Sequence, residues 1–449
     1  MALAWPAFAG ATEPPFQPVE KTVSERTGAA IRWQQDAAAR EEALAQVRAI
    51  LKKPLTVNAA VRIALLNNRG WLATLEDVGV SAADLREAGM WKNPSVDLSI
   101  RFPNRASVMA DNEEGAAFDL LDLLMLPLRK RVAAERLAAT QMRVSDRALE
   151  LVAEVKEAIY ALQADEAMIT QRKTIVDINA AATDLAKRQH DAGNITDLAL
   201  AQQQSVYDAA RLDLMTVENA RREHREKINR LLSLWGSDLA WKLAGGLPPV
   251  PENEVTLRGL ESLAVAQRLD LAAAHAELAG IVRALGLTKS YRYIGALEFG
   301  VNSEREPEGE RITGPTLRLE LPLFNQGQAR IAKGEVELRQ AERRVEGLTI
   351  DIRADVRALH DKLVALRETA RLYEKDLLPT RRAITDDTQL RYNGMLLGNY
   401  ELFTARAEQV ESENKSIEVL RDYWTTRAQL ERAVGGNLRP RATAPSKKK

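Results

Sequence analysis

Apolar and polar positions along the chain follow two different periods, one helical and one strand-like. In two stretches apolar side chains recur every three or four residues, with Arg, Glu and Asp at the positions between them. This spacing places the apolar side chains on one face of a long helix. The two stripes consist of Val144, Ala148, Leu151, Val155, Ala158 and Leu162, and of Leu338, Ala341, Val345, Leu348, Ile352, Val356, Leu359, Leu363, Leu366 and Ala370. A helix over about 129–189 would be about 90 Å long, which predicts packing in coiled coils.

Four shorter segments alternate with a period of two, and we predict strands at about 94–102, 116–126, 293–302 and 315–323. Their charged positions, on the face opposite the apolar one, include Asp97, Arg101, Glu298, Arg318 and Glu320. The segment 116–126 is irregular because Asp119 and Asp122 fall on opposite parities, so we expect a bulge or a register shift there. Polar loops, Pro103–Gly115 and Ser303–Gly314, join the two strand pairs.

Strands with one apolar and one charged face fit two kinds of protein. In a transmembrane β-barrel the apolar face meets lipid and the charged face lines a water-filled lumen, and each strand needs only about 9–11 residues. A half-buried sheet in a soluble protein alternates equally well, so the strands alone leave both interpretations open. Since a barrel needs at least about eight strands, four per chain would require an oligomer.

Landmarks in the first half of the chain recur in the same order about 200 residues later. Thr56–Ala64 is echoed by Thr256–Ala264, and Leu126-Pro127-Leu128 by Leu321-Pro322-Leu323. We therefore predict two copies of one unit. The expected organisation is an N-terminal segment at 12–55, repeat 1 at 56–235, a Gly- and Pro-rich linker at 236–255, repeat 2 at 256–436, and a disordered tail at 437–449.

Composition removes most classes of chemistry. The 449 residues include 63 basic and 63 acidic side chains, so no global field attracts nucleic acid. There is no cysteine, and the four histidines are far apart, which excludes thiol chemistry and the usual metal-ligand spacings. Neither a phosphate-binding loop nor a nucleophile motif is present, and no run approaches the length of a membrane-spanning helix. We expect no enzyme, no cofactor and no resident metal.

The first eleven residues are apolar and end in small side chains. Ala7-Phe8-Ala9 resembles the end of a secretory signal, although the basic region that normally precedes it is missing. We interpret 1–11 as the remnant of a signal, and the alternative is an apolar start without a targeting role.

The chain resembles the TolC-like outer-membrane efflux proteins over about 56–436. The resemblance depends on the duplicated unit and on three short motifs: Asn93-Pro94-Ser95, Leu321–Gly327, and Arg391-Tyr392-Asn393-Gly394 followed by Leu402–Ala405. It implies an α+β membrane protein, a homotrimer whose 12-stranded β-barrel, four strands per chain, lies in the outer membrane. A long α-helical coiled-coil barrel would continue through the periplasm, where the N-terminal segment 12–55 would also lie. The implied partners are outer-membrane lipid, a periplasmic adaptor (membrane fusion) protein and an inner-membrane transporter.

The resemblance also implies a gate at the far periplasmic ends of the helical hairpins, whose turns we expect near 190–198 and 392–400. By position and residue type the gate candidates are Glu401, Asp197, Tyr392, Arg391, Leu396 and Leu397. An ordinary turn, with Gly193 and Gly394 ending helices and Asp197 capping the next, is the competing interpretation.

The expected function is a passive exit duct of a tripartite efflux or type I secretion system, in the outer membrane and extending into the periplasm. The alternative is a soluble periplasmic coiled-coil scaffold or adaptor, in which the same chain covers the apolar side of the strands. The sequence does not indicate which solute is exported.

Overall fold

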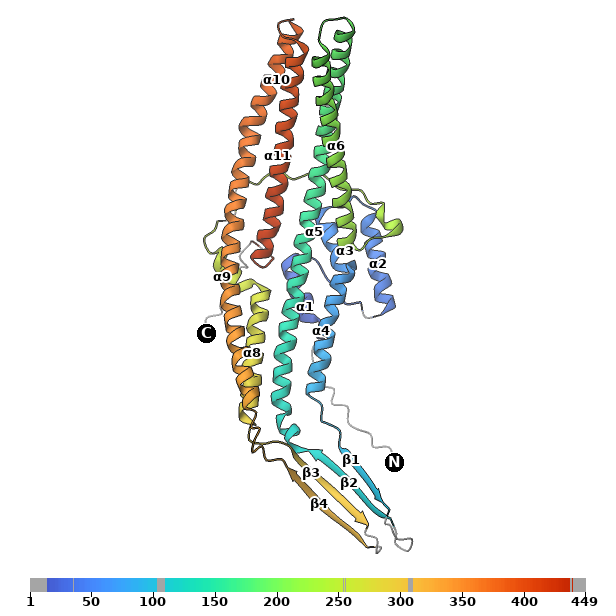
Figure 1. Ribbon diagram of the computed structural model, residues 1–449, viewed down its shortest axis with the longest axis vertical. Coiled ribbons are helices and arrows are strands. Elements are labelled where there is room, and N and C mark those ends of the chain that lie inside the picture. The colour runs from blue at the N-terminus through green and yellow to red at the C-terminus, as the bar shows by residue number, and fades with distance from the viewer. Residues whose placement is uncertain are drawn as a thin grey trace, which may run out of the picture. The chain divides into compact units, whose positions relative to one another are not determined.

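The computed structural model describes residues 14–34, 36–102, 110–252, 254, 256–305, 310–436 and 438. The predicted signal remnant at 1–11 and all of the predicted tail except residue 438 therefore lie outside the described residues. The chain is mostly helical, with four short strands (Figure 1). Its first half contains α1 (Gln17–Thr27), α2 (Ala37–Leu51), α3 (Val57–Asn67), α4 (Arg69–Ala88), β1 (Ser95–Arg101), β2 (Asp111–Asp119), α5 (Leu120–Asp191), α6 (Asp197–Leu232) and η1 (Gly236–Leu239). Its second half contains α7 (Leu260–Gln267), α8 (Leu269–Ser290), β3 (Leu297–Arg305), β4 (Arg311–Leu319), α9 (Gln328–Leu372), η2 (Tyr373–Leu377), α10 (Leu378–Asn393) and α11 (Asn399–Ala433).

The elements form two compact units, and each unit takes segments from both halves of the chain. Unit 1 consists of residues 1–19, 75–144 and 269–350, and unit 2 of residues 20–74, 145–268 and 351–449. The order of helix, helix, strand, strand and long helices occurs in each half. The duplication and its boundaries stay predictions, and the compact units are assembled across them.

The apolar stripe predicted on the first long helix is buried along its whole length. Its six residues from Val144 to Leu162 lie on α5, and each is at most 2% exposed. On α9, Ile352, Val356 and Leu363 are fully buried, whereas the stripe positions before them are partly exposed. Burial of these side chains is the main source of stability for such long helices.

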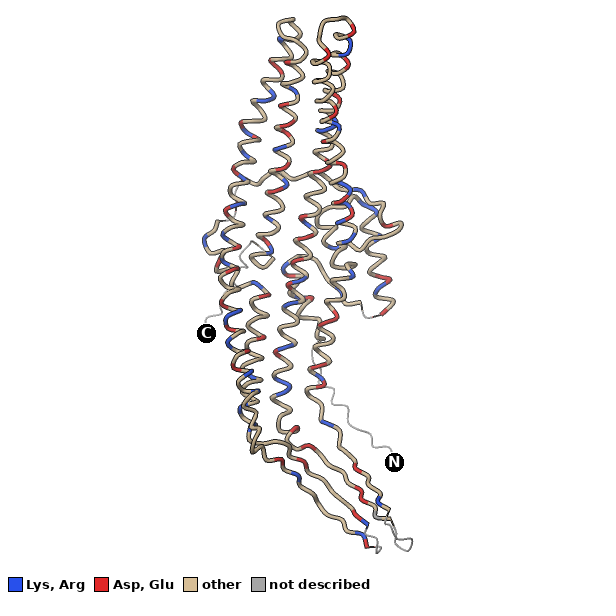
Figure 2. The backbone as a smooth tube through the Cα atoms, viewed as in Figure 1, with Lys and Arg blue, Asp and Glu red and all other residues tan. Residues whose placement is uncertain are grey.

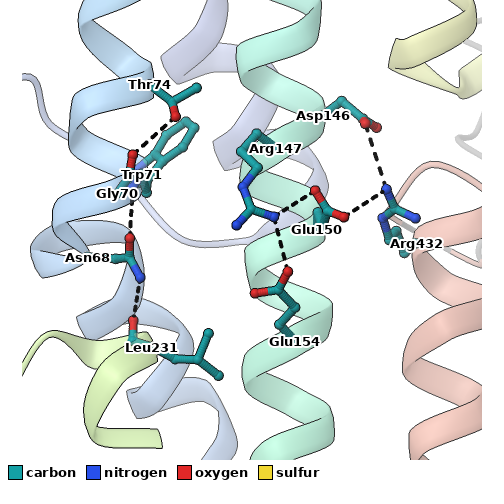
Figure 3. A network of polar contacts seen from close by, with 10 residues as sticks. All are labelled: Asn68, Gly70, Trp71, Thr74, Asp146, Arg147, Glu150, Glu154, Leu231 and Arg432. Carbon is teal, nitrogen blue, oxygen red and sulfur yellow. Dashed lines mark hydrogen bonds and ion pairs between the residues drawn. The ribbon is translucent and has the colours of Figure 1, made fainter. Parts of the chain in front are cut away.

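Side chains at the junction of α3 and α4 form hydrogen bonds with the C-terminal end of α6. The side-chain amide of Asn67 donates to the carbonyl oxygen of Leu232 at 2.7 Å, and that of Asn68 donates to the carbonyl oxygen of Leu231 at 2.8 Å. The Oδ1 atom of Asn68 also accepts from the backbone N–H of Trp71 at 2.7 Å (Figure 3). The last carbonyls of α6, which have no partner inside the helix, are thus satisfied by side chains.

A second polar network connects α5 with α11 in unit 2. Arg147 donates to Glu150 at 2.7 Å and to Glu154 at 3.0 Å, all three on α5. Arg432 on α11 lies 3.5 Å from Glu150 and 3.9 Å from Asp146 (Figure 3). Glu150 is therefore shared between an arginine of its own helix and one of a neighbouring helix.

The strand predicted at 116–126 is wrong in its second half. β2 covers Asp111–Asp119, and α5 begins at Leu120. The carboxylate of Asp119 accepts the backbone N–H of Asp122 at 2.9 Å, and Asp122 is paired with Arg129 in the first turns of the helix. Asp119 and Asp122 fall on opposite parities because a helix starts between them, so no bulge is needed.

The strands of the second pair are displaced from the predicted ranges toward their connecting turn. β3 runs to Arg305 and β4 starts at Arg311, where the sequence predicted the loop Ser303–Gly314. The hydroxyls of Ser303 and Thr313 lie 3.0 Å apart across the ladder. Strand pairing thus continues into polar residues, because pairing depends on backbone hydrogen bonds. In the first pair, residues 103–109 of the predicted loop Pro103–Gly115 lie outside the described residues.

Two helices differ from the sequence expectation. α8 is long and apolar enough to cross a membrane by length and composition alone, where the sequence predicted no such run. The second hairpin is not continuously α-helical, since the π-helix η2 separates α9 from α10. Pro379 stands in the first turn of α10 and lacks the N–H needed for the preceding turn, which explains the wider turn.

Candidate functional site

The four strands form one antiparallel sheet at an end of unit 1 (Figure 1). The strand order is β1-β2-β3-β4, and β1 and β4 have no further strand partner among the described residues. Both edges therefore carry unpaired backbone N–H and C=O groups. Such open edges pair readily with another chain.

One face of the sheet is apolar and is not covered by the chain. Val96 is 68% exposed, Leu98 75% and Leu317 67%. The other large apolar residues exposed on this face are Ile100, Phe118, Phe299, Val301 and Leu319. The condition set for a soluble scaffold, that the same chain buries this face, is not met by the described residues. A contiguous exposed apolar face marks a surface that meets lipid or another protein.

The opposite face is polar and carries a hollow. The hollow is lined by Asp97, Ser99, Glu113, Glu298, Asn302, Thr316 and Arg318, together with parts of neighbouring residues. The register places these positions on the same side of all four strands. The charged side of the sheet is thus its concave side, as in the wall of a barrel with a polar interior.

The sheet brings most of the predicted lumen residues onto this polar face. Arg318 pairs with Glu298 at 3.1 Å across β3 and β4. Arg101 pairs with Glu113 at 3.0 Å. Asp97 lies opposite Gly115 and has no polar partner among the described residues. Glu320 follows the end of β4, where its backbone N–H donates to Ala296 at 2.9 Å.

Sequence reasoning missed two residues of this face, Glu113 and Glu304, whereas Asn302 was predicted on the polar side of its strand. The side-chain amide of Asn302 donates to Glu113 at 2.8 Å, and Glu304 lies directly opposite Glu113 in the ladder. Glu113 and Glu304 both fall inside ranges predicted as loops. Their parity with Gly115 and Glu298 was the available signal, since strand residues two apart share a face.

A glycine allows the strands to approach closely on the concave face. A Cβ atom added at Gly300 would lie 2.6 Å from the carbonyl oxygen of Ala116 and 2.9 Å from the hydroxyl of Thr316. No side chain fits there without moving a neighbouring strand. Glycine at such a position permits the bend that a curved sheet requires.

The gate candidates lie at the two hairpin turns, which are at the same end of unit 2 (Figure 1). Thr196 caps α6, and Asp197 is its first residue. The Asp197 carboxylate lies 2.6 Å from Nε2 of His190 in the last turn of α5. Asp197 therefore bridges the two ends of its own turn, and the cap predicted at Asp197 is wrong, because Thr196 occupies that position.

The pH dependence of this turn follows from the hydrogen bond to Asp197, which raises the pKa of His190. A raised folded-state pKa adds stability below the unfolded value of about 6.5 and loses it as pH rises through the folded value. We expect hydrogen exchange at 190–198, corrected for its intrinsic pH dependence, to accelerate on going from pH 6 to pH 8.5. The Asp197→Asn variant is expected to flatten this profile, and an unchanged profile would contradict the assignment.

The second turn contains a methionine where the first has a glycine. Gly193 has a φ of 74° two residues after the end of α5, and Met395 takes a φ of 57° two residues after the end of α10. The same pattern of backbone hydrogen bonds closes both helix ends, with Asn194 donating to Gln189 at 2.8 Å and Leu396 to Arg391 at 2.9 Å. Met395 is therefore sterically strained in a left-handed conformation that glycine adopts without strain.

Relieving this strain is expected to stabilise the second turn. In Met395→Gly we expect about 1 kcal/mol of local stabilisation, seen as about fivefold slower hydrogen exchange at 393–399. The matched change Gly193→Ala is expected to accelerate exchange at the first turn by a similar factor. Equal exchange in Met395→Gly and the parent chain would show that the turn is not strained.

The remaining gate candidates are placed at the second turn, where a backbone hydrogen bond from Leu396 joins it to Arg391, but no side-chain hydrogen bond or ion pair is found between these described residues. Arg391 pairs with Asp387 one helical turn earlier, at 2.9 Å. The Glu401 carboxylate folds back over Gly398, the residue that precedes α11. Leu396 is exposed, whereas Tyr392 and Leu397 are half-buried.

The contact between the two turns comes from a residue that the sequence did not single out. The hydroxyl of Tyr400 donates to Oε1 of Gln189 at 3.1 Å, which joins α11 to α5. Tyr400 lies eight residues after Tyr392 and next to Glu401, and nothing in the sequence distinguishes it from other helical tyrosines. The described residues contain no group of three or more His, Asp or Glu side chains arranged to hold a metal ion.

Comparisons with known proteins agree with the arrangement of long helices and a four-stranded sheet. Residues 60–236 match the family model described as outer membrane efflux protein. No curated protein matches the chain. Solved structures of similar fold include the CmeC outer membrane channel of Campylobacter jejuni, with a TM-score of 0.72, 15% identity, and coverage of 85% of each chain. The MtrE outer membrane channel of Neisseria gonorrhoeae, in its open state, gives a TM-score of 0.68 at 15% identity over 87% of this chain and 89% of that one. The outer membrane protein VceC of Vibrio cholerae gives 0.66 at 14% identity over 88% and 97%.

Proposed function

We propose that this chain, whose resemblance to the TolC-like outer-membrane efflux proteins is confirmed by the family match and the fold, is one third of a passive exit duct. Three copies would close a 12-stranded barrel in the outer membrane, and their helices would continue as a tunnel into the periplasm. The localisation expected from the sequence, the outer membrane with an extension into the periplasm, agrees with the family and with these channels.

The two-faced sheet is the observation that carries this proposal. Its exposed apolar face suits lipid, its concave charged face suits water, and both of its edges are free to pair. Two copies would give eight strands, and a barrel of that size is just filled by its own side chains. Three copies give twelve, which leaves room for a water-filled lumen.

The long helices would supply the periplasmic part of the proposed duct. The hairpin turns 191–197 and 393–399 would form its inner end and meet a periplasmic adaptor, which in turn meets an inner-membrane transporter. Met395, at 94% exposure, and Leu396 offer apolar contacts at that end. The duct would supply no chemistry of its own, and the transporter would supply the energy for a tripartite efflux or type I secretion system.

Because the chain has no cysteine, a single introduced cysteine reports on one position only. Thr316 and Leu317 are neighbours on β4 with opposite facings. In protein reconstituted in membranes, Thr316→Cys is expected to react with a water-soluble maleimide and Leu317→Cys to be protected. In mild detergent the mass, corrected for bound detergent, should be near three times 49.8 kDa. Equal reactivity of the two cysteines, or a detergent-free monomer, would contradict the proposal and favour the scaffold.

The gate proposal has a separate test at Glu401. Three copies of this carboxylate around a threefold axis would attract cations and repel one another. Glu401→Gln is expected to change the conductance of the closed channel in planar bilayers. Unchanged conductance and ion selectivity would leave the turn without a gating role.

A further inference from the structure

The polar face of the sheet has an excess of negative charge, although the chain as a whole is neutral. Two arginines, Arg101 and Arg318, stand on this face within the strands. The carboxylates on the same face, among the side chains that the structure describes, are Asp97, Glu113, Asp119, Glu298 and Glu304. The excess is therefore a local property of this surface.

Ion pairs compensate some of these carboxylates but not all of them. Glu113 and Glu298 each lie within 3.1 Å of an arginine, and Asp119 lies 3.2 Å from Lys92. Asp97 and Glu304 have no cationic partner among the described residues. Glu304 also faces Glu113 directly across the ladder, where like charges repel. The uncompensated charge therefore resides mainly on Asp97 and Glu304, at two levels of the same face.

The opposite face shows that this distribution depends on the side of the sheet. Glu114 follows Glu113 on β2 but points to the apolar face, where it pairs with Arg311 at 3.0 Å. Arg305 lies on that face as well, directly opposite Arg311. The charged residues of the outer face are thus mostly basic, and those of the concave face mostly acidic.

We propose that this concave face makes the duct selective for cationic solutes over anionic ones, with Asp97 and Glu304 as the specificity-determining residues. The inference rests on the proposed function, because only a closed ring of strands turns the face into the wall of a lumen. Repeated around such a ring, the uncompensated carboxylates form rings of negative charge, which favour cations in a pore. No ion needs to be held at a fixed position, since a concave low-dielectric wall focuses the field of its charges.

The proposal predicts a strong dependence on ionic strength. The field of a wall charge extends about 30 Å at 0.01 M salt and about 3 Å at 1 M. A wide lumen should therefore discriminate at low salt and lose discrimination at high salt. The reversal potential across a planar bilayer under a KCl gradient measures this directly. We expect a ratio of K⁺ to Cl⁻ permeability of about three or more near 0.01 M, and a ratio near one at 1 M.

Neighbouring residues of opposite facing supply the matched controls. At low salt, Asp97→Asn with Glu304→Gln is expected to reduce the permeability ratio at least twofold, and Glu113→Gln to reduce it less. Glu114→Gln removes a carboxylate from the same strand on the outer face and should leave the ratio unchanged. Single-channel conductance at 1 M KCl should be similar in all variants, which checks that each variant is assembled.

The outcomes separate this inference from the function on which it rests. Absence of any conductance in the parent protein would overturn the duct itself. Conductance with a ratio near one at low salt, or a ratio equally reduced by Glu114→Gln and by the Asp97 and Glu304 changes, would overturn only the selectivity. A reduced ratio confined to the concave-face variants would establish it.

Discussion

Leu317→Arg is expected to abolish insertion into the membrane while leaving the long helices folded. Leu317 is in β4 on the uncovered apolar face, 67% exposed. An arginine that faces lipid near the middle of a bilayer costs about 2–4 kcal/mol, and a symmetric trimer meets this cost three times. The measurement is the fraction of refolded protein that floats with liposomes in a density gradient, together with helix content by circular dichroism.

Thr316→Arg provides the matched control for this substitution. Thr316 precedes Leu317 on the same strand but lines the hollow of the polar face, where an arginine stays in water. This variant should float with liposomes as the parent chain does. If both variants float equally, the apolar face does not meet lipid. In a water-exposed sheet both substitutions would be close to neutral.

Arg427→Met is expected to lower the free energy of unfolding by about 3–5 kcal/mol, because it removes the arginine partner of a buried carboxylate. Arg427 of α11 lies 3.2 Å from both carboxylate oxygens of Glu254, whose side chain is 3% exposed. Tyr423, fully buried, donates its hydroxyl to the same carboxylate. Burial, and then the hydrogen bond to Glu254, raise the pKa of Tyr423, so this hydroxyl stays protonated and cannot replace the cation. Denaturant unfolding of the refolded protein measures the effect.

A double substitution distinguishes loss of the ion pair from loss of packing. Arg427→Met combined with Glu254→Gln removes both charges and should recover more than half of the loss. No recovery would mean that the alkyl part of Arg427 supplies most of the stability. Arg421→Met, on the same helix and paired among the described residues with the neighbouring Asp422 at 2.8 Å, should change stability by less than about 1 kcal/mol.

The long helices and the two faces of the sheet could be predicted from the sequence, because both depend on residue spacing. The stripe from Val144 to Leu162 is buried as its period predicts, and Val96, Leu98 and Ile100 share one exposed face. Spacing does not determine where strand becomes helix. The run from Leu120 to Leu128 is compatible with either, and the side chain of Asp119, which caps the helix, decides between them.

Less of the candidate site could be predicted from the sequence. Glu298 and Arg318 were both predicted to face a lumen, and the cross-strand register now pairs them. Glu304 was assigned to a loop, because a polar run resembles a loop until its partner strand is known. Tyr400 joins the two hairpin turns through Gln189, a contact between residues 211 positions apart that no local pattern encodes.

The register also fixes how the strands must incline. Val96, Ala116, Val301 and Pro315 form one row across the sheet. On β1 the exposed apolar residues lie on the turn side of this row, at Leu98, Ile100 and Phe102, whereas after β4 they continue on the helix side, to Leu321 and Leu323. The apolar band thus crosses the sheet diagonally. A bilayer is flat, so in the proposed barrel the strands would be tilted to the membrane normal, as strands are in closed barrels at about 35–45°. In the proposed ring, copies that join β1 to β4 would then meet with a stagger of several residues, which contributes to the shear of the barrel.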